Sequence, residues 1–525
     1  MSHSTFARAL AVGVAFMAVS GHAAGQSAQP EFDLLIVNGR VLDGSGNPWI
    51  RQDVGVRGDR IAAIGRLDPA SADRVIDAAG RIVSPGFIDV HSHALGGIQR
   101  ESLRTAQGLI AQGITTVVGN PDGGGPIDLR QQAADLEDGG IGVNAALLIG
   151  HGSVRRAVLG NAEQQPTPEE LDEMRAIVRQ GMADGAFGLS SGLFYTPGRW
   201  ATTEEVIELA REAGQVYTSH IRDEASYDVG VVASVDEVIR IAEEAGVRGV
   251  VSHMKALGPD SWGLSETLVA NLAEARRRGV EVYADQYPYE ASSTSIGAAL
   301  MPGEGGQSAR EAMTGDTSRE ILLDRVRENI RRRGGPESLV IASGRGAADF
   351  IGRHLGDIAE SRAVSPEQAA IDIVLAGGAS IISFNMSHDD IDRIMQQSWT
   401  MASSDGGLTE PGRGQPHPRG NGAFARRIAQ YVVERQVLPL EQAVRTATSL
   451  AAAVFELPDR GEIRIGAFAD LLIFDPERVV ERATWDDPHQ FSEGFDWVIV
   501  NGEVAQAEGE FQGIRAGRVL RRVIR

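Results

Sequence analysis

The chain contains no cysteine among its 525 residues. This absence excludes disulfide bonds and thiolate metal ligands, so any bound metal ion must be held by nitrogen and oxygen atoms. The apolar stretch near the N-terminus, residues 9–19, is too short to cross a bilayer as a permanent helix. The metal chemistry open to the chain is therefore that of histidine and carboxylate ligands.

Positive charge is scarce. Lys and Arg number 50 against 71 Asp and Glu, which gives a formal net charge of −21 and a pI near 5.0. This balance argues against nucleic acids and membrane surfaces as partners. An anionic small molecule is not excluded, because a local cationic pocket can bind it. With 42% hydrophobic residues the chain can build a sizeable core, and its length fits an α/β barrel with an appended domain.

The first residues resemble a targeting segment. Arg8 precedes the apolar run, and the small residues Gly21, Ala23 and Ala24 follow it. This order is typical of a cleavable secretory signal peptide. We expect residues 1–24 to be removed and the protein to be exported, to a bacterial periplasm. The alternative interpretation is a buried N-terminal helix.

Both ends of the mature chain predict short strands and tight turns, in residues 31–84 and again in 456–525. Asn38-Gly39 predicts one hairpin and Arg57-Gly58-Asp59 a second. Asn501-Gly502 follows an apolar strand near the C-terminus in the same way. Because short strands need partners to bury their apolar faces, the two ends are expected to form one small β domain.

Residues 85–455 alternate apolar strands with helical segments. Thr167 followed by Pro168 predicts a capped helix start. The alternation breaks at residues 290–350, which we interpret as an insertion, and resumes with a helix at 366–376 and a strand at 381–385. Repeated β-α units imply parallel strands, with active residues on the loops after their C-terminal ends.

The strand Phe87–Val90 leads into His91-Ser92-His93. Residues i and i+2 of a strand point to the same face, so the two imidazoles can converge on one ion. A lone H-x-H pair has little meaning, so the prediction depends on ligands at other strand ends.

Other predicted strands also end in candidate ligands, namely His220, His253 and Asp405. An isolated histidine at such a place is more often a hydrogen-bonded structural residue, but the repeated placement favours a metal site. His151, which follows another strand, is a weaker candidate for the pocket. Hydrolysis of an amide also needs a base that passes a proton to the leaving nitrogen, and Asp405 fits that role. The alternative for Asp405 is a turn residue before Gly406-Gly407.

With these residues in view, the chain resembles the amidohydrolase superfamily, and more closely the D-aminoacylases (N-acyl-D-amino-acid deacylases). The similarity covers nearly the whole mature chain. Besides the histidines and Asp405, the motifs that carry it are Gly150-His151-Gly152-Ser153-Val154-Arg155, Gly188-Leu189-Ser190-Ser191-Gly192-Leu193, Ser219-His220-Ile221-Arg222-Asp223-Glu224, Ser252-His253-Met254-Lys255, Asp285-Gln286-Tyr287-Pro288-Tyr289, His417-Pro418-Arg419 and Gly466-Ala467-Phe468-Ala469-Asp470-Leu471.

The resemblance implies a (β/α)8 TIM-like barrel with a small β-sandwich domain, and a site for one or two Zn²⁺ ions. It implies that His220 and His253 hold the tightly bound ion, while His91, His93 and Asp405 serve a weaker position or the catalytic water. The substrate carboxylate is then held by Lys255, Tyr287 and Ser293. Arg222 and Arg419 are further candidates, with structural ion pairing as the alternative for each.

One departure from the family stands out. The second strand of these enzymes commonly ends in Gly-Asn-Cys-Gly, whose thiolate binds metal, whereas this chain has Gly119-Asn120-Pro121-Asp122-Gly123. Asp122 is a candidate replacement ligand, and a carboxylate is harder than a thiolate. The alternative is that Asp122 only begins a Gly-rich turn and the site holds one ion.

The function that follows is metal-dependent hydrolysis of N-acyl amino acids, of D configuration, to a carboxylate and a free amino acid. One alternative is an amidohydrolase acting on another amide, a dipeptide, a cyclic amide or a lactone, because a fold does not fix a function. Another is a solute-binding protein, which has no use for Asp405 beside a metal. The expected partner is the small-molecule substrate, and the sequence does not indicate an oligomeric state.

Overall fold

The computed structural model describes residue 1, residues 30–302 and residues 306–522. The expected signal peptide lies outside these residues except for Met1. Across the described ranges, no helix combines the length and the apolar character that a membrane crossing requires.

Strands from both ends of the chain form one nine-stranded sheet. The two parts meet where β5 pairs antiparallel with β18, Pro85 lying opposite Leu471. The prediction that both termini build a common β domain is confirmed. The strands are β1 (Phe32–Val41), β2 (Ile50–Arg57), β3 (Arg60–Gly65), β4 (Ala72–Asp77), β5 (Ile82–Pro85), β18 (Leu471–Phe474), β19 (Phe495–Val500), β20 (Glu503–Ala507) and β21 (Glu510–Phe511).

Asn38-Gly39 does not make the predicted hairpin. β1 continues through both residues, and its register with β2 shifts between Ile36 and Gly39, which marks a bulge. Asn38 has a φ of 59°, which asparagine tolerates better than most residues. A Cβ on Gly39 would lie 2.4 Å from the Val83 side chain, so the glycine is required by close packing. The other two predicted turns do connect antiparallel strands, β2 to β3 and β19 to β20.

The central region is a barrel with eight parallel strand positions, one of which is shared by β8 and β9. The pairing runs β6-β7-β8 and β9-β10-β11-β12-β13-β17. Backbone hydrogen bonds join the two arcs, from Phe187 N to Leu147 O and from Asp405 N to His91 O. The strands are β6 (Phe87–Asp89), β7 (Ile114–Gly119), β8 (Asn144–Leu147), β9 (Ile149–Gly150), β10 (Gly188–Gly192), β11 (Val216–His220), β12 (Arg248–Val251), β13 (Val282–Gln286) and β17 (Thr400–Ala402).

Helices cover the outside of the barrel, as α5 (Pro168–Ala183) illustrates. Thr167 and Glu170 form a capping box at its start, which confirms the predicted helix boundary. Met174, Val178 and Met182 recur every four residues and are buried in one apolar cluster with strands β9 and β10. The other principal barrel helices are α3 (Leu129–Gly139), α4 (His151–Leu159), α6 (Thr203–Ala213), α7 (Val231–Ala245), α8 (Ser265–Arg277), α14 (His388–Met395), α15 (Arg419–Arg426), α16 (Leu440–Ala447) and α17 (Ser449–Val454).

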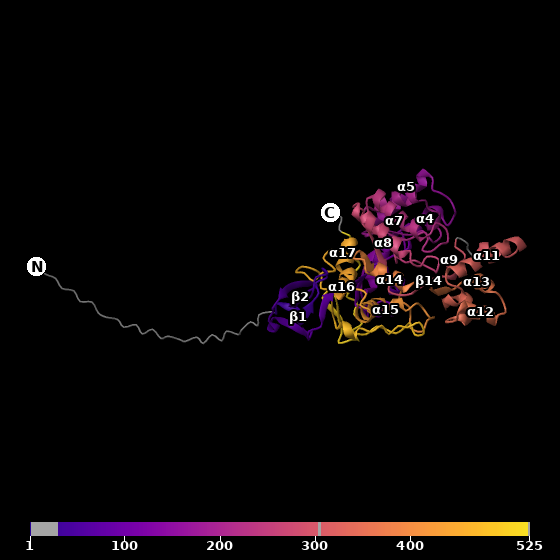
Figure 1. Cartoon of the computed structure of the whole chain (residues 1–525). Helices are drawn as coiled ribbons and strands as arrows, with labels where there is room; N and C mark the ends of the chain where they lie inside the picture. Colours follow the sequence, from indigo (N-terminus) through magenta and orange to yellow (C-terminus); the bar gives the residue numbers. More distant parts are fainter. Residues whose placement is uncertain (2–29, 303–305, 523–525) are drawn as a thin grey trace.

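The inserted unit is longer than the predicted residues 290–350. The strand predicted at 381–385 is β16, the central strand of a three-stranded antiparallel sheet, not a barrel strand. The helices of this unit enclose their own apolar cluster and, in Figure 1, lie at the end of the molecule opposite β1 and β2. The unit comprises β14 (Ala291–Ser295), α9 (Ile296–Leu300), α10 (Gly306–Ala312), α11 (Asp316–Arg332), β15 (Leu339–Ser343), α12 (Leu355–Ser361), α13 (Pro366–Leu375) and β16 (Ser380–Phe384).

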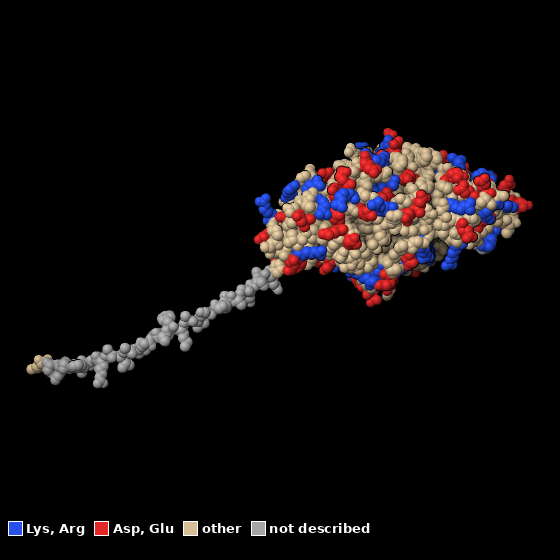
Figure 2. Space-filling view, turned by 90° about the horizontal axis from the view of Figure 1, so that it is seen from below, with Lys and Arg blue, Asp and Glu red and all other residues tan. Residues whose placement is uncertain are grey.

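The negative net charge is spread over the surface that Figure 2 shows. Acidic and basic residues alternate across that face, and no large area of one sign is visible there. Exposed ion pairs occur on the described surface, such as Arg240 with Glu204 at 2.9 Å.

Candidate metal centre and substrate cavity

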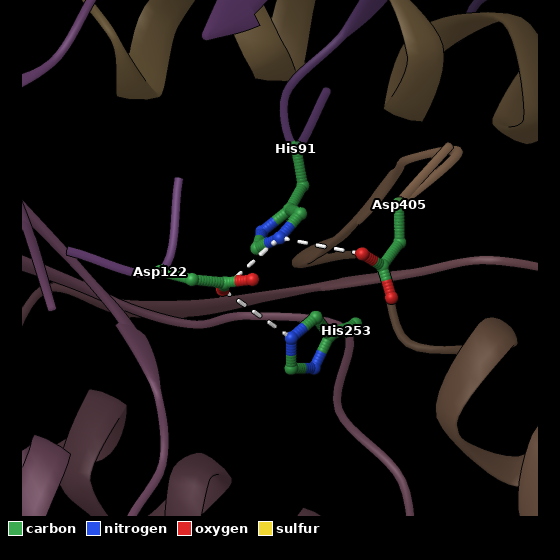
Figure 3. A group of neighbouring side chains, drawn as sticks. All are labelled: His91, Asp122, His253 and Asp405. Atoms are coloured by element: carbon green, nitrogen blue, oxygen red, sulfur yellow. Dashed lines mark ion pairs between the residues drawn. The ribbon is translucent and has the colours of Figure 1, made fainter. Parts of the chain in front are cut away.

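Four side chains from four different strand ends converge at one edge of the barrel (Figure 3). They are His91 after β6, Asp122 after β7, His253 after β12 and Asp405 after β17. Asp122 lies between the two imidazoles, with Oδ1 3.2 Å from His91 Nε2 and 3.6 Å from His253 Nε2. The potential ligand atoms of the group all lie within 4.8 Å of one another. The strand ends predicted from the sequence therefore do share one site.

His93 borders the same group from the open side. Its Nε2 lies 3.3 Å from Asp122 Oδ2 and 3.2 Å from Asp405 Oδ1. Its side chain is 42% exposed, whereas that of His91 is 1% exposed. The H-x-H pair is thus brought to the centre, with one member deep in the barrel and the other at its mouth.

A second group of ligands shares His253 with the first. His220, Glu224 and His253 also bring potential ligand atoms within 4.8 Å of one another. His220 Nδ1 lies 2.9 Å from His253 Nε2, and Glu224 Oε1 lies 3.0 Å from His253 Nδ1. Lys255 Nζ hydrogen-bonds Glu224 and lies 2.8 Å from His253 Nδ1.

Several of these residues have a backbone that L-amino acids rarely adopt. The φ angles are 56° at Asp122, 35° at His253 and 49° at Asp405. Positive φ at a residue other than glycine costs free energy and is concentrated at functional sites. The strain is located where strands end and aim side chains at the barrel mouth.

The residues fit a divalent ion. His91 Nε2, Asp122 Oδ1 and His220 Nε2 are buried and have no hydrogen-bond partner among the described residues. Imidazole and carboxylate groups at such spacing are a suitable ligand set for zinc and similar ions. Burial alone would raise the pKa of Asp122, but the imidazoles around it hold that pKa well below its usual range. Asp122 is therefore an anion at neutral pH, as a ligand must be.

Asp405 is held between the imidazoles and a guanidinium. Arg419 Nη1 lies 2.7 Å from Asp405 Oδ2, while Oδ1 faces His91 and His93. Burial would raise the pKa of Asp405, but Arg419 and His253 outweigh it and keep that pKa well below its usual range. Asp405 is therefore ionised at neutral pH.

Two buried aspartates orient the strand ends. Asp89 accepts hydrogen bonds from the backbone N and the Oγ of Ser404, next to Asp405, and from His91 N. Its burial raises its pKa to about 6. Asp285 Oδ1 accepts from His253 N at 2.9 Å. Such supporting contacts fix the direction of ligand side chains.

A cavity of about 470 Å³ opens onto these groups. The three residues expected to bind a substrate carboxylate, Lys255, Tyr287 and Ser293, all line it, as does Arg419. The hydroxyl of Tyr287 is buried without a hydrogen-bond partner in the described part of the chain. Lys255 uses Nζ contacts to Glu224 and His253, which leaves one of its three N–H donors for a ligand.

Two candidate residues lie elsewhere. Arg222 lines a different cavity and forms an ion pair with Glu237 at 2.7 Å. This contact agrees with the alternative interpretation of Arg222 as a structural ion-pair residue. His151 begins α4, is fully buried and lies 2.9 Å from Glu205 Oε1, while the other oxygen of that carboxylate, Oε2, pairs with the buried Arg155. Neither residue lines the substrate cavity.

Glu224 belongs to the site but was not among the residues predicted from the sequence. Its signal is the spacing His220-x-x-x-Glu224, four residues apart on the loop after β11. Burial would raise the pKa of Glu224, but Lys255 and the two imidazoles hold it well below its usual range. Asp89 was also not predicted, although it is the last residue of β6 and lies two positions before His91.

Comparisons with known proteins agree with this site. A model of the amidohydrolase family matches residues 74–506. A D-aminoacylase of Alcaligenes xylosoxydans xylosoxydans is 36% identical, over 95% of this chain and 99% of that protein. The crystal structure of an N-acyl-D-glutamate deacylase from Bordetella bronchiseptica, complexed with zinc and a phosphonate that mimics the tetrahedral intermediate, superimposes with a TM-score of 0.80. It is 35% identical and covers 94% of this chain and all of that chain.

A D-aminoacylase structure described as having a binuclear metal centre, with one-metal activation and second-metal attenuation, also has a TM-score of 0.80. It is 33% identical, over 94% of this chain and all of that chain. The length of these matches and the convergence of histidines and aspartates at the barrel mouth lead to the same assignment. The chain belongs to the amidohydrolase family, in its D-aminoacylase branch, and is a metal-dependent hydrolase.

Proposed function

We propose that this enzyme hydrolyses the amide bond of N-acyl-D-amino acids and releases a carboxylate and a free D-amino acid. The observation that carries the proposal is the single cavity that joins the histidine–aspartate group to carboxylate-binding side chains. D-Aminoacylase and N-acyl-D-glutamate deacylase are the named activities of relatives that match nearly the whole chain.

His91, His93, His220 and His253 are the proposed metal ligands, with Asp122 in place of the family's cysteine and Asp405 completing the set. Asp122 Oδ1 is the oxygen nearest to both His91 and His253, which supports a role shared between the two ligand groups. A bound Zn²⁺ supplies Lewis acidity, which polarises the acyl carbonyl and lowers the pKa of water. One or two ions fit this ligand set.

Asp405 is the proposed general base and acid. Its carboxylate accepts a proton from the attacking water through Oδ1, the oxygen on the histidine side. The same carboxylate then delivers that proton to the leaving nitrogen. Arg419 holds Oδ2 and so fixes the plane of the carboxylate during both transfers.

Lys255, Tyr287 and Ser293 are proposed to bind the α-carboxylate of the substrate. The free Tyr287 hydroxyl and the third Lys255 N–H are donors that lack protein partners among the described residues. Charge-assisted hydrogen bonds from these groups would orient the amide toward Asp405. A cyclic amide, which has no free α-carboxylate, would leave those donors unused.

The test is a panel of N-acetyl-D- and N-acetyl-L-amino acids assayed with zinc-loaded enzyme, with metal content measured on the same sample. We expect turnover of D substrates and little turnover of their L enantiomers. Absence of turnover with every N-acyl amino acid, together with hydrolysis of a cyclic amide or a dipeptide, would replace this function by the alternative.

We also propose export, on the basis of the sequence of residues 1–24 alone. Expression of the full chain in a bacterium, followed by cell fractionation and intact-mass measurement, tests it. We expect the protein in the periplasm with its N-terminus near residue 24 or 25. A cytoplasmic protein of full mass would refute it.

A further inference from the structure

Three cationic side chains other than histidine line the substrate cavity, and they differ in their partners. Lys255 pairs with Glu224, and Arg419 pairs with Asp405. The third is Arg333. Within the described residues, no carboxylate lies at ion-pair distance from the Arg333 guanidinium.

Arg333 is not a surface residue that water can solvate freely. It follows the last residue of α11, in the inserted unit, and is 3% exposed. Its Nε donates to the hydroxyl of Tyr227 at 2.5 Å, and its Nη1 donates to Ser383 Oγ at 3.1 Å. Both partners are neutral. A guanidinium has five N–H donors, so most of them have no protein acceptor in the described part of the chain.

Burial of a charge without a counter-charge is unfavourable, so such an arrangement needs a reason. Hydrogen bonds to the hydroxyls of Tyr227 and Ser383 require a donor at this position, but a neutral donor would be sufficient. These two contacts therefore do not explain the positive charge. The cavity that Arg333 lines also carries small polar side chains, among them Ser292, Thr294 and Ser380. A ligand in this cavity can therefore contact the Arg333 guanidinium and several hydroxyl groups.

We propose that Arg333 receives a second carboxylate of the substrate, so that the preferred substrates are N-acyl amino acids carrying two carboxylates. The inference rests on the proposed function, in which Lys255, Tyr287 and Ser293 take the α-carboxylate. The second carboxylate belongs to an acidic amino-acid side chain or to a dicarboxylic acyl group. In either case the guanidinium forms paired hydrogen bonds with it and supplies the missing counter-charge.

The wild-type test compares isosteric substrates. N-acetyl-D-glutamate and N-acetyl-D-glutamine differ only in the charge and donor pattern at the far end of the side chain. We expect kcat/KM for the glutamate compound to exceed that for the glutamine compound by at least tenfold. N-succinyl-D-leucine against its terminal amide, N-succinamoyl-D-leucine, is the matching acid and amide pair for a carboxylate on the acyl half, and the larger of the two preferences identifies the source.

The variant test uses Arg333→Gln, Arg333→Lys and a control at a neighbouring hydroxyl. Arg333→Gln should lower the acid-to-amide ratio of kcat/KM at least tenfold, chiefly through KM of the acidic substrate. Arg333→Lys keeps the charge and should retain part of the ratio. Ser383→Ala removes a hydrogen-bond acceptor but no charge, so its ratio should stay within about threefold of the wild type.

The outcomes separate the two proposals. The wild type could turn over neutral N-acyl-D-amino acids and show an acid-to-amide ratio of kcat/KM near one for both substrate pairs. This result would overturn the role of Arg333 and leave the proposed function intact. An unchanged ratio in Arg333→Gln, or a ratio in Arg333→Lys as low as that expected for a neutral side chain, would also overturn it. If Arg333→Gln does not fold, as judged by circular dichroism, the wild-type ratios and Arg333→Lys decide. No turnover of any N-acyl amino acid would remove the proposed function itself.

Discussion

Arg419 and Asp405 form an ion pair at 2.7 Å, at the point where the histidine group meets the substrate cavity. The arginine leaves one carboxylate oxygen of Asp405 directed at the imidazoles and occupies the other. Asp405→Asn keeps the shape but cannot accept a proton. We expect kcat to fall by about 10²- to 10⁴-fold, with metal content close to that of the wild type.

Steady-state kinetics and elemental analysis of the same Asp405→Asn sample check this. A near-normal kcat would remove Asp405 as the base. Loss of all metal together with activity would instead make Asp405 chiefly a ligand.

Asp122 is the proposed replacement for the cysteine that the family resemblance implies, so its exchange tests whether it is a ligand. Asp122→Ala should bind less metal than the wild type. Asp122→Cys should restore binding and shift preference toward softer ions such as Cd²⁺. Cobalt-loaded Asp122→Cys should also show a thiolate-to-metal charge-transfer band, which the cysteine-free wild type lacks. Unchanged metal content in Asp122→Ala would mean that the residue only begins the Gly-rich turn.

Three of the histidines at the barrel mouth, His253, His220 and His93, should differ in their effect on metal content. His253 belongs to both ligand groups, His220 to one and His93 to neither, although His93 lies beside Asp122. We expect metal loss in the order His253→Ala, His220→Ala, His93→Ala. His388→Ala, at the start of an outer helix, is the control for loss of a histidine. Full metal retention in both His253→Ala and His220→Ala would contradict the proposed ligand set.

Metal uptake should depend on pH. The partial burial of His93 opposes its protonation, but hydrogen bonds to Asp122 and Asp405 outweigh this effect and raise the pKa of His93 to about 9 in the metal-free protein. His93 is therefore protonated at pH 7, and a metal ion that binds it must displace that proton. Calorimetry in buffers of different ionisation enthalpy should detect proton release, and affinity should rise as pH approaches 9. His93→Ala should release fewer protons, and equal release would refute the assignment.

Glu205 is expected to matter for stability and not for metal. Its carboxylate neutralises Arg155, which is fully buried, and contacts His151 at 2.9 Å. Glu205→Ala leaves a buried cation unpaired and should reduce the free energy of unfolding by about 3–5 kcal/mol. Glu204→Ala, one residue earlier on the exposed face, is the matched control and should change it far less. Denaturant titration measures the free energy of unfolding of both variants. If Glu205→Ala kept full stability but bound less metal, the contact of Glu205 with His151 would have to support the metal site.

Much of the site could be predicted because its residues follow strands. His91, His220, His253 and Asp405 all stand at ends of apolar segments, and the parallel order of β-α units brings those ends to one edge. Glu224 escaped notice because it lies in the loop beyond β11, where its spacing from His220 is the only mark in the sequence. Arg333 escaped because its contact with the cavity depends on how the inserted unit packs over the barrel.

In the terminal sheet, the local sequence was not sufficient to predict the conformation of Asn38-Gly39. Asn-Gly favours both tight hairpins and positive φ, and the local sequence does not distinguish a turn from a bulge at Asn38-Gly39. The pairing of β1 with β5 and the contact of Gly39 with Val83 decide in favour of the bulge. Likewise β16 has the composition of a barrel strand, and only its antiparallel neighbours β14 and β15 assign it to the inserted unit.

The antiparallel contact between β5 and β18 sets an order of events for synthesis. β5 consists of four buried residues, Ile82–Pro85, and one of its edges is paired by Leu471–Phe474, from the far end of the chain. Until those last residues have been made, an apolar strand edge next to the first barrel strand has no partner. Nascent or truncated chains that stop before Leu471 should therefore be prone to aggregation and proteolysis. The sheet therefore couples the folding of the first strands of the chain to the synthesis of β18.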